Sequence, residues 1–254
     1  MRLIDSHCHF DDPAFDPDRT QLQQKMAESG VTDIIFPATI AAHWPRLKAI
    51  TDKHPGFHAS YGLHPMFMQY HKDSHINFLH DWLDKETAVA IGECGLDFFI
   101  PGFDQQSQET LFLQHLRLAH EFDLPLIIHA RKSLDIVLKH IRRTGPLRGV
   151  IHSFAGSQQQ ADQLINAGFY LGIGGTITYE RAKRLQKVVR HIPENHLLLE
   201  TDAPDQPDSL WRGKRNEPGR LPLIANAIAT IRETSIEHIA AITTQNAREL
   251  FALR

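Results

Sequence analysis

The sequence predicts a closed (β/α)8 barrel formed by one domain, residues 1–254. First, short apolar runs alternate along the chain with longer amphipathic stretches, which is the pattern of parallel strands joined by crossover helices. Second, eight such runs fit into the 254 residues, as a barrel of this type requires. Third, histidines and carboxylates gather where the runs end, and the carboxyl ends of barrel strands form the reactive face.

The apolar runs give the strands in chain order. They are Leu3–Cys8, Val31–Pro37, Phe57–Leu63, Ala88–Glu93, Pro125–His129, Gly149–His152, Phe169–Ile173 and Leu197–Glu200. The other stretches carry apolar residues at helical spacing and give the helices. They are Asp18–Ser29, Ala41–Lys53, Ile76–Leu83, Gln105–Phe122, Ser133–Arg143, Gln158–Asn166, Glu180–Arg190, Pro218–Arg232 and Ile236–Leu253.

Some helix boundaries carry their own chemical signals. Ser157 stands where the sixth helix begins, and serine is a common N-terminal cap. Gly30 and Gly168 follow helices, at positions where a left-handed closing residue is expected. The main alternative, an open doubly wound sheet, more often carries a glycine-rich loop after its first strand. This chain has His7 and His9 there, and no repeat or long linker interrupts the alternation.

The composition excludes several classes of protein. Hydrophobic residues make up 42% and charged residues 22% of the chain, which is ordinary for a globular protein with a sizeable core. The net charge of −3 gives no global attraction to nucleic acid or anionic membranes. The sequence has neither a long apolar span nor a signal-peptide pattern, so we expect no membrane association. Cys8 and Cys94 are too few for a disulfide framework, which favours a reduced, cytoplasmic protein.

The first apolar run leads into two histidines separated by one residue, His7 and His9. If the run continues as a strand, both imidazoles lie on one face and can bind the same cation. Later runs also end in histidine or carboxylate residues. These are His64, Glu93 with Asp97, His129, His152, and Glu200 with Asp202. Buried polar groups at strand ends are costly unless something pairs with them, which indicates a metal site.

Four imidazoles and two carboxylates are enough for two divalent cations. We expect His7, His9, Asp202 and Glu93 to bind one ion, and Glu93, His129 and His152 to bind the other, with Glu93 bridging. Two such ions activate a water molecule and stabilise charge on the attacking and leaving oxygens, which is hydrolase chemistry suited to phosphoesters. Imidazole and carboxylate ligands suit zinc, manganese or iron, and magnesium less readily.

Catalytic roles follow for three of these residues. Glu93 joins the two ions, and Asp202 accepts a proton from the attacking water as general base. His64 precedes Pro65 in a rigid turn, where it either hydrogen-bonds the substrate or a leaving oxygen, or serves only the structure.

The motifs together resemble the TatD family of metal-dependent deoxyribonucleases. They are Asp5-Ser6-His7-Cys8-His9, Gly62-Leu63-His64-Pro65, Gly92-Glu93-Cys94-Gly95-Leu96-Asp97, Ile128-His129-Ala130-Arg131, His152-Ser153-Phe154, Glu200-Thr201-Asp202-Ala203-Pro204, Arg212–Pro218 and the terminal Thr244-Gln245-Asn246-Ala247-x-x-Leu250-Phe251. The resemblance implies a barrel of the amidohydrolase type with a dinuclear site. Its ligand pattern falls on the same six residues, and it allows magnesium-supported activity.

Two departures from that family concern the substrate. After Pro204 the family usually has an aromatic and an aliphatic residue, whereas this chain has Asp205 and Gln206, with Asp208 close behind. Acidic side chains beside the site would repel the phosphates of long nucleic acids. In addition, Phe98 and Phe99 stand where a tyrosine is common, which removes a hydroxyl group.

The leading functional hypothesis is a two-metal phosphodiesterase that acts on single-stranded DNA from its 3′ end. Basic residues on loops at the reactive face are the expected phosphate contacts. They are Arg131, Lys132, Arg212, Lys214 and Arg215. The alternative is a hydrolase of a small carboxylic ester, lactone or amide. Many enzymes of that kind carry a carboxylated lysine on the fourth strand, and Glu93 in that place favours a phosphoester, either DNA or a small molecule. A monomer is compatible with the sequence.

Overall fold

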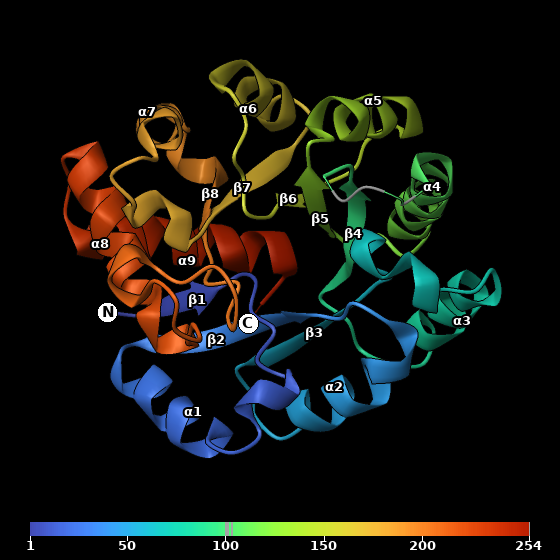
Figure 1. The fold of residues 1–254 in the computed structure, drawn as a ribbon, viewed down its shortest axis with the longest axis horizontal. Coiled ribbons are helices and arrows are strands. Elements are labelled where there is room, and N and C mark those ends of the chain that lie inside the picture. The colour runs from blue at the N-terminus through green and yellow to red at the C-terminus, as the bar shows by residue number, and fades with distance from the viewer. Residues whose placement is uncertain (100–101, 103, 254) are drawn as a thin grey trace.

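The computed structural model describes residues 1–99, 102 and 104–253, and in this part of the chain eight parallel strands follow one another around a barrel. They are β1 (Leu3–Asp5), β2 (Val31–Pro37), β3 (Phe57–Tyr61), β4 (Ala90–Asp97), β5 (Leu126–Arg131), β6 (Gly149–Ile151), β7 (Phe169–Ile173) and β8 (Leu197–Leu199). Figure 1 shows the helices as a ring outside the strands. The predicted (β/α)8 barrel is confirmed.

The first and last strands meet through backbone hydrogen bonds at and just beyond their ends. The Ser6 N–H donates to the carbonyl oxygen of Leu199, and the Asp202 N–H donates to that of His7, both at 2.9 Å. The Asp5 carboxylate adds a side-chain link, accepting from the Thr201 N–H (2.9 Å) and hydroxyl (2.6 Å). These contacts close the barrel and bring the ends of β1 and β8 together.

The helices occupy the predicted stretches with shifted ends. They are α1 (Arg19–Glu28), α2 (Trp44–Thr51), α3 (Ser74–Leu83), α4 (Gln105–Glu121), α5 (Leu134–Thr144), α6 (Gln158–Ile165), α7 (Lys183–His191), α8 (Leu221–Arg232) and α9 (Ile236–Phe251). Helices α2 and α8 begin later than predicted because their first turns are separate 3₁₀ segments, Ala41–His43 and Pro218–Arg220. The predicted caps are confirmed. The Ser157 hydroxyl accepts from the Gln160 N–H, and Gly30 and Gly168 have positive φ angles.

Strand ends differ from the predictions in a way that matters for the site. Strand β1 ends at Asp5, so His7 and His9 lie beyond it, and the expectation that they share a strand face is wrong. In the opposite sense, β4 continues past Glu93 to Asp97 because Gly95, Leu96 and Asp97 pair with β5. A side chain on Gly95 would overlap the carbonyl oxygen of His129, so glycine is required for this pairing.

Two apolar layers leave one end of the barrel for polar groups. A large cluster fills the space between the strands and the helices. A smaller cluster joins one residue from each of six strands to α9. Its members are Ile4, Ile35, Ala90, Ile127, Val150 and Leu198 with Ala247, Leu250 and Phe251. Helix α9 also packs on β1 and β8. The amino end of the barrel is thus plugged, and the polar groups gather at the carboxyl end.

None of the helices in the described residues has both the length and the apolarity needed to span a bilayer.

Candidate active site

A cavity of about 1440 Å³ opens at the carboxyl ends of the strands. Five of the predicted metal-binding residues line it, and the sixth, His7, is fully buried beneath them. Those five are His9, Glu93, His129, His152 and Asp202. Residues from β4, β5 and the loops after β1, β6 and β8 therefore converge at one point, as the strand-end argument predicted.

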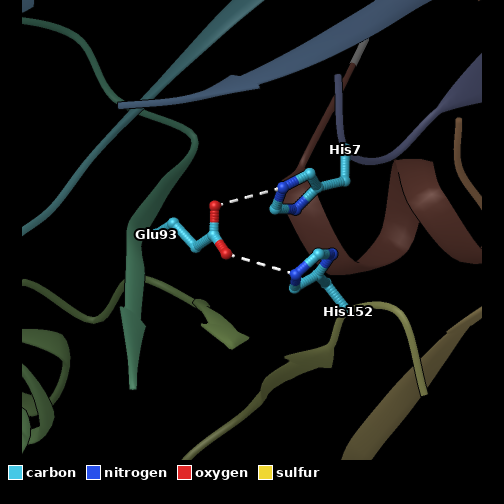
Figure 2. Close-up of side chains that lie close together, drawn as sticks. All are labelled: His7, Glu93 and His152. Atoms are coloured by element: carbon cyan, nitrogen blue, oxygen red, sulfur yellow. Dashed lines mark ion pairs between the residues drawn. The ribbon is translucent and has the colours of Figure 1, made fainter. Parts of the chain in front are cut away.

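Glu93 occupies the centre of this cluster and presents its two carboxylate oxygens to different partners. Oε2 lies 3.2 Å from His7 Nε2 and 3.4 Å from His9 Nε2. Oε1 lies 3.2 Å from both His129 Nδ1 and His152 Nε2. Figure 2 shows the carboxylate between His7 and His152, with one oxygen directed at each ring. The side chain is only 2% exposed, so these contacts replace water.

The first group of donors surrounds Oε2 of Glu93. His7 Nε2 and His9 Nε2 are 3.3 Å apart, and Asp202 Oδ1 lies 3.5 and 3.6 Å from them, respectively. Two ligand nitrogens held about 2.1 Å from one cation at a tetrahedral angle are separated by about 3.4 Å, so the observed spacing suits a shared metal ion.

The second group surrounds Oε1 of Glu93. His129 Nδ1 and His152 Nε2 are 3.4 Å apart, which again suits one cation. His64 belongs to the same group, with Nε2 at 2.8 Å from Glu93 Oε1. Because its Nδ1 accepts from the Met66 N–H, Nε2 carries the proton and donates to Glu93. His64 thus contacts the central carboxylate directly, and its predicted contact with substrate stays a prediction.

The charges at the cluster agree with a cation site. Burial raises the pKa of Glu93, but the imidazoles of His64, His7 and His152 outweigh this effect and hold the pKa well below its usual value. Burial lowers the pKa of His64 to about 4, so this ring is neutral at neutral pH. Burial raises the pKa of Asp202 to about 6, against the opposing effect of His152 and His9. Imidazoles around anionic carboxylates form the donor set that zinc and manganese prefer.

Two carboxylates behind the cluster hold its imidazoles. Asp97 Oδ2 lies 2.9 Å from His129 Nε2, so the ring turns Nδ1 toward Glu93. Glu200 Oε1 lies 3.6 Å from His152 Nδ1 and accepts a short hydrogen bond from the Ser153 N–H. Gly172 makes room for Glu200, since a Cβ there would overlap the carboxylate. Such partners fix ring orientation in metal sites.

Gln206 forms a further contact that sequence reasoning missed. Its side-chain amide donates to Asp202 Oδ2, and its amide oxygen accepts from the Ser153 hydroxyl at 2.9 Å. Asp202 therefore directs Oδ1 at the histidines while Oδ2 is held by Gln206. Gln206 stands where the TatD pattern has an aliphatic side chain. This polar residue in place of an aliphatic one is the feature of the sequence that could have indicated the contact.

Of the five basic residues predicted to contact substrate phosphates, Arg131 and Lys132 line the cavity. Arg212, Lys214 and Arg215 are absent from its lining, so the structure does not bring them to the site. Arg215 donates two hydrogen bonds to the Asp18 carboxylate, at 3.0 and 2.6 Å. Lys214 lies over the Trp211 ring, 5.5 Å from its centroid. Loop position alone could not reveal these local partners.

The predicted acidic side chains also separate into two kinds. Asp205 lines the cavity. Asp208 is buried and accepts two hydrogen bonds of 2.8 Å from Arg220, so its charge is compensated away from the site. Conversely, Arg181 and Arg184 line the cavity although no motif marked them in the sequence.

Comparison with known proteins agrees with this arrangement. The sequence profile described as TatD related DNase matches residues 4–252. The chain is 38% identical over 253 residues to the uncharacterized metal-dependent hydrolase YjjV of Escherichia coli K12, covering 98% of each chain. It is 32% identical to the uncharacterized metal-dependent hydrolase YabD of Bacillus subtilis, covering 99% of each. The crystal structure of the TatD homologue YjjV superimposes with a TM-score of 0.96 at 36% identity, covering 100% of this chain and 99% of that one. The chain therefore belongs to the TatD-related DNase family of metal-dependent hydrolases.

Proposed function

We propose that the protein is a phosphodiesterase with a dinuclear metal site that removes nucleotides from the 3′ end of single-stranded DNA. The proposal rests on the two carboxylate oxygens of Glu93, which have different partners. Oε2 faces His7 and His9, while Oε1 faces His129 and His152. One carboxylate shared by two groups of imidazoles provides for two cations rather than one.

The residues have distinct tasks in this proposal. His7, His9, Asp202 and Glu93 would hold one ion, and Glu93, His129 and His152 the other. When bound, two divalent ions supply Lewis-acid stabilisation of the phosphate oxygens. Asp202 takes the proton from the attacking water as general base. His64 keeps Glu93 in place through its Nε2–H and lines the cavity.

The cavity supports a phosphoester over a small carboxylic ester, lactone or amide. Arg131, Lys132, Arg181 and Arg184 line it, and cationic side chains suit the charge of phosphates. Position 93 on β4 holds a glutamate rather than a lysine that could be carboxylated. The described chain supplies all six metal-binding candidates by itself, so a monomer suffices for the activity.

The test is a metal-exchange activity screen. Chelator-treated protein should be inactive on bis(p-nitrophenyl) phosphate and on labelled single-stranded DNA, and zinc, manganese or magnesium should restore both activities. DNA blocked at its 3′ end should resist digestion, whereas DNA blocked at its 5′ end should not. Turnover of lactones or amides with no attack on phosphodiesters would instead establish the small-ester alternative, and digestion from the 5′ end would refute the proposed polarity.

A further inference from the structure

We propose that the rim of the cavity formed by the loops after β5, β6 and β7 is a binding surface for the phosphates of a single-stranded polynucleotide. Four basic residues carry this surface, namely Arg131, Lys132, Arg181 and Arg184, and we call them the cationic rim. The inference rests on the proposed phosphodiesterase function, and it assigns the path of the substrate strand to one side of the site.

The first half of the cationic rim lies at the carboxyl end of β5. The Arg131 guanidinium carbon is 3.7 Å from the centroid of the Phe99 ring, and Lys132 Nζ is 4.7 Å from it. An aromatic ring attracts cations without cancelling their charge. Phe99 is 46% exposed and lines the cavity together with Arg131 and Lys132. It holds two positive charges at the cavity mouth.

The second half lies where the chain enters α7. Arg184 donates to the carbonyl oxygens of Ala155 (3.0 Å) and Gly156 (3.3 Å) in the loop after β6. The Arg181 guanidinium carbon lies 5.4 Å from the centroid of the Tyr179 ring. Neutral carbonyls and a ring thus position both guanidinium groups and leave their charge available for an anion.

The four residues of the cationic rim differ from the basic residue across the cavity in whether a carboxylate neutralises their charge. Within the described residues, none of the four forms an ion pair with a carboxylate. Arg46, on the opposite wall, lies 2.5 Å from the Asp16 carboxylate. A charge compensated in this way contributes little to binding a second anion.

The remaining wall of the cavity is acidic. Asp11 and Asp12 follow β1, and Asp205 follows β8. One carboxylate, Asp135, lies on the cationic side, where it accepts a hydrogen bond from Gln160. Phosphates are therefore repelled beside β1 and β8 and attracted beside β5 to β7. A substrate strand leaving Glu93 over the cationic rim meets favourable charge, and only its cleaved end faces the acidic wall.

The test compares two double variants of equal charge. Arg181→Gln/Arg184→Gln removes half of the cationic rim. Lys183→Gln/Lys187→Gln removes the same charge from exposed positions of α7 that do not line the cavity. Binding of fluorescein-labelled phosphorothioate oligo(dT) to metal-loaded protein is measured by anisotropy over a range of salt concentrations. Because each phosphate contact contributes about 0.7 to the slope of log K against log salt, the first variant should lower that slope by about 1.4.

A second pair of single variants covers the β5 side. Lys132→Gln should lower the slope by about 0.7, and Lys139→Gln, on the exposed face of α5, should leave it at the wild-type value. Circular dichroism melting curves verify that all variants are folded.

The inference is overturned if wild-type protein does not bind the oligonucleotide, if the slopes of the rim variants stay at the wild-type value, or if the control variants lower them equally. Failure of the proposed function looks different. In that case the salt slope still falls in the rim variants, while wild-type protein leaves bis(p-nitrophenyl) phosphate and single-stranded DNA intact.

Discussion

At the scale of single residues, Asp202 has the most demanding role. Replacing it with asparagine keeps the size of the side chain and the hydrogen bond to Gln206 but removes the proposed base and a negative charge from the proposed ligand set. We expect kcat on bis(p-nitrophenyl) phosphate to fall by about 10²- to 10⁴-fold, the usual contribution of a general base. The matched control is Asp205→Asn, which makes the same chemical change at a carboxylate that lines the cavity but does not contact the cluster. Comparable activity in Asp202→Asn and wild type would exclude the assigned role.

Asp97 permits a second test at this scale. Its carboxylate fixes the His129 ring, so Asp97→Ala should weaken metal binding about 10- to 100-fold, the usual cost of removing such a partner. Isothermal titration with zinc or manganese measures the effect directly. Asp33→Ala is the control, because Asp33 makes an equivalent 2.9 Å contact with His58 far from the cavity. Equal metal affinity in both variants would show that Asp97 does not position His129.

At the scale of elements, α4 supports the turn that carries His64. His115 on this helix is fully buried, donates from Nδ1 to the Leu111 carbonyl oxygen and accepts the Leu63 N–H at Nε2. Because one ring nitrogen donates and the other accepts, these hydrogen bonds require the neutral imidazole. Burial, together with the nearby His71, lowers the pKa of His115 from 6.5 to about 4, against the opposing effect of the hydrogen bond to Leu111.

This depressed pKa predicts a pH dependence of stability. The unfolded chain binds the proton near pH 6.5 and the folded chain only near pH 4, so the contribution is complete above the first value and is lost as the pH falls toward the second. The loss amounts to about 3 kcal/mol. Compared with wild type, His115→Gln should therefore lose stability less steeply between these pH values in urea unfolding experiments. Parallel stability profiles for the two proteins would contradict the argument.

The elements also show how far the sequence alone could lead. All eight strands were predictable because strands buried on both faces read as apolar runs. Their ends were not, because hydrogen bonds to a neighbouring strand decide them. Asp97 remains in β4 since it pairs with Arg131, while His7 leaves β1. The six metal-binding candidates could still be found, since they only needed to stand near strand ends.

Other parts of the site could not be predicted because they depend on tertiary contacts. Gln206 is close to Asp202 in the sequence, but its side chain is also held by the hydroxyl of Ser153 in the loop after β6, and no local pattern specifies that contact. Likewise, Arg215 was expected at the substrate, but the neighbouring Asp18 of another segment engages it. The members of the cationic rim share the lack of an ion pair with any carboxylate of the described residues, and a sequence does not show which ion pairs form.

At the scale of the whole molecule, metal binding should stabilise the barrel, because the two groups of donors link segments from both ends of the chain. A ligand at 100 times its Kd stabilises the folded state by about 2.7 kcal/mol. For a domain of this size, a chelator should then lower Tm by about 5–10 °C, as measured by calorimetry. The Glu93→Gln variant, which lacks the shared carboxylate, should show a smaller difference. Identical melting curves with and without metal would exclude a tight site.

The junction between β1 and β8 also determines when the site comes into being during translation. His7 and His9 leave the ribosome well before their hydrogen-bond partners at the seam, Asp202 and Ala203. A nascent chain interrupted before β8 holds the earlier donors without the contacts that assemble them. Helix α9, which plugs the barrel, follows later still. Assembly of the candidate metal site is therefore withheld until β8 and α9 have been synthesised, and chains interrupted earlier lack it.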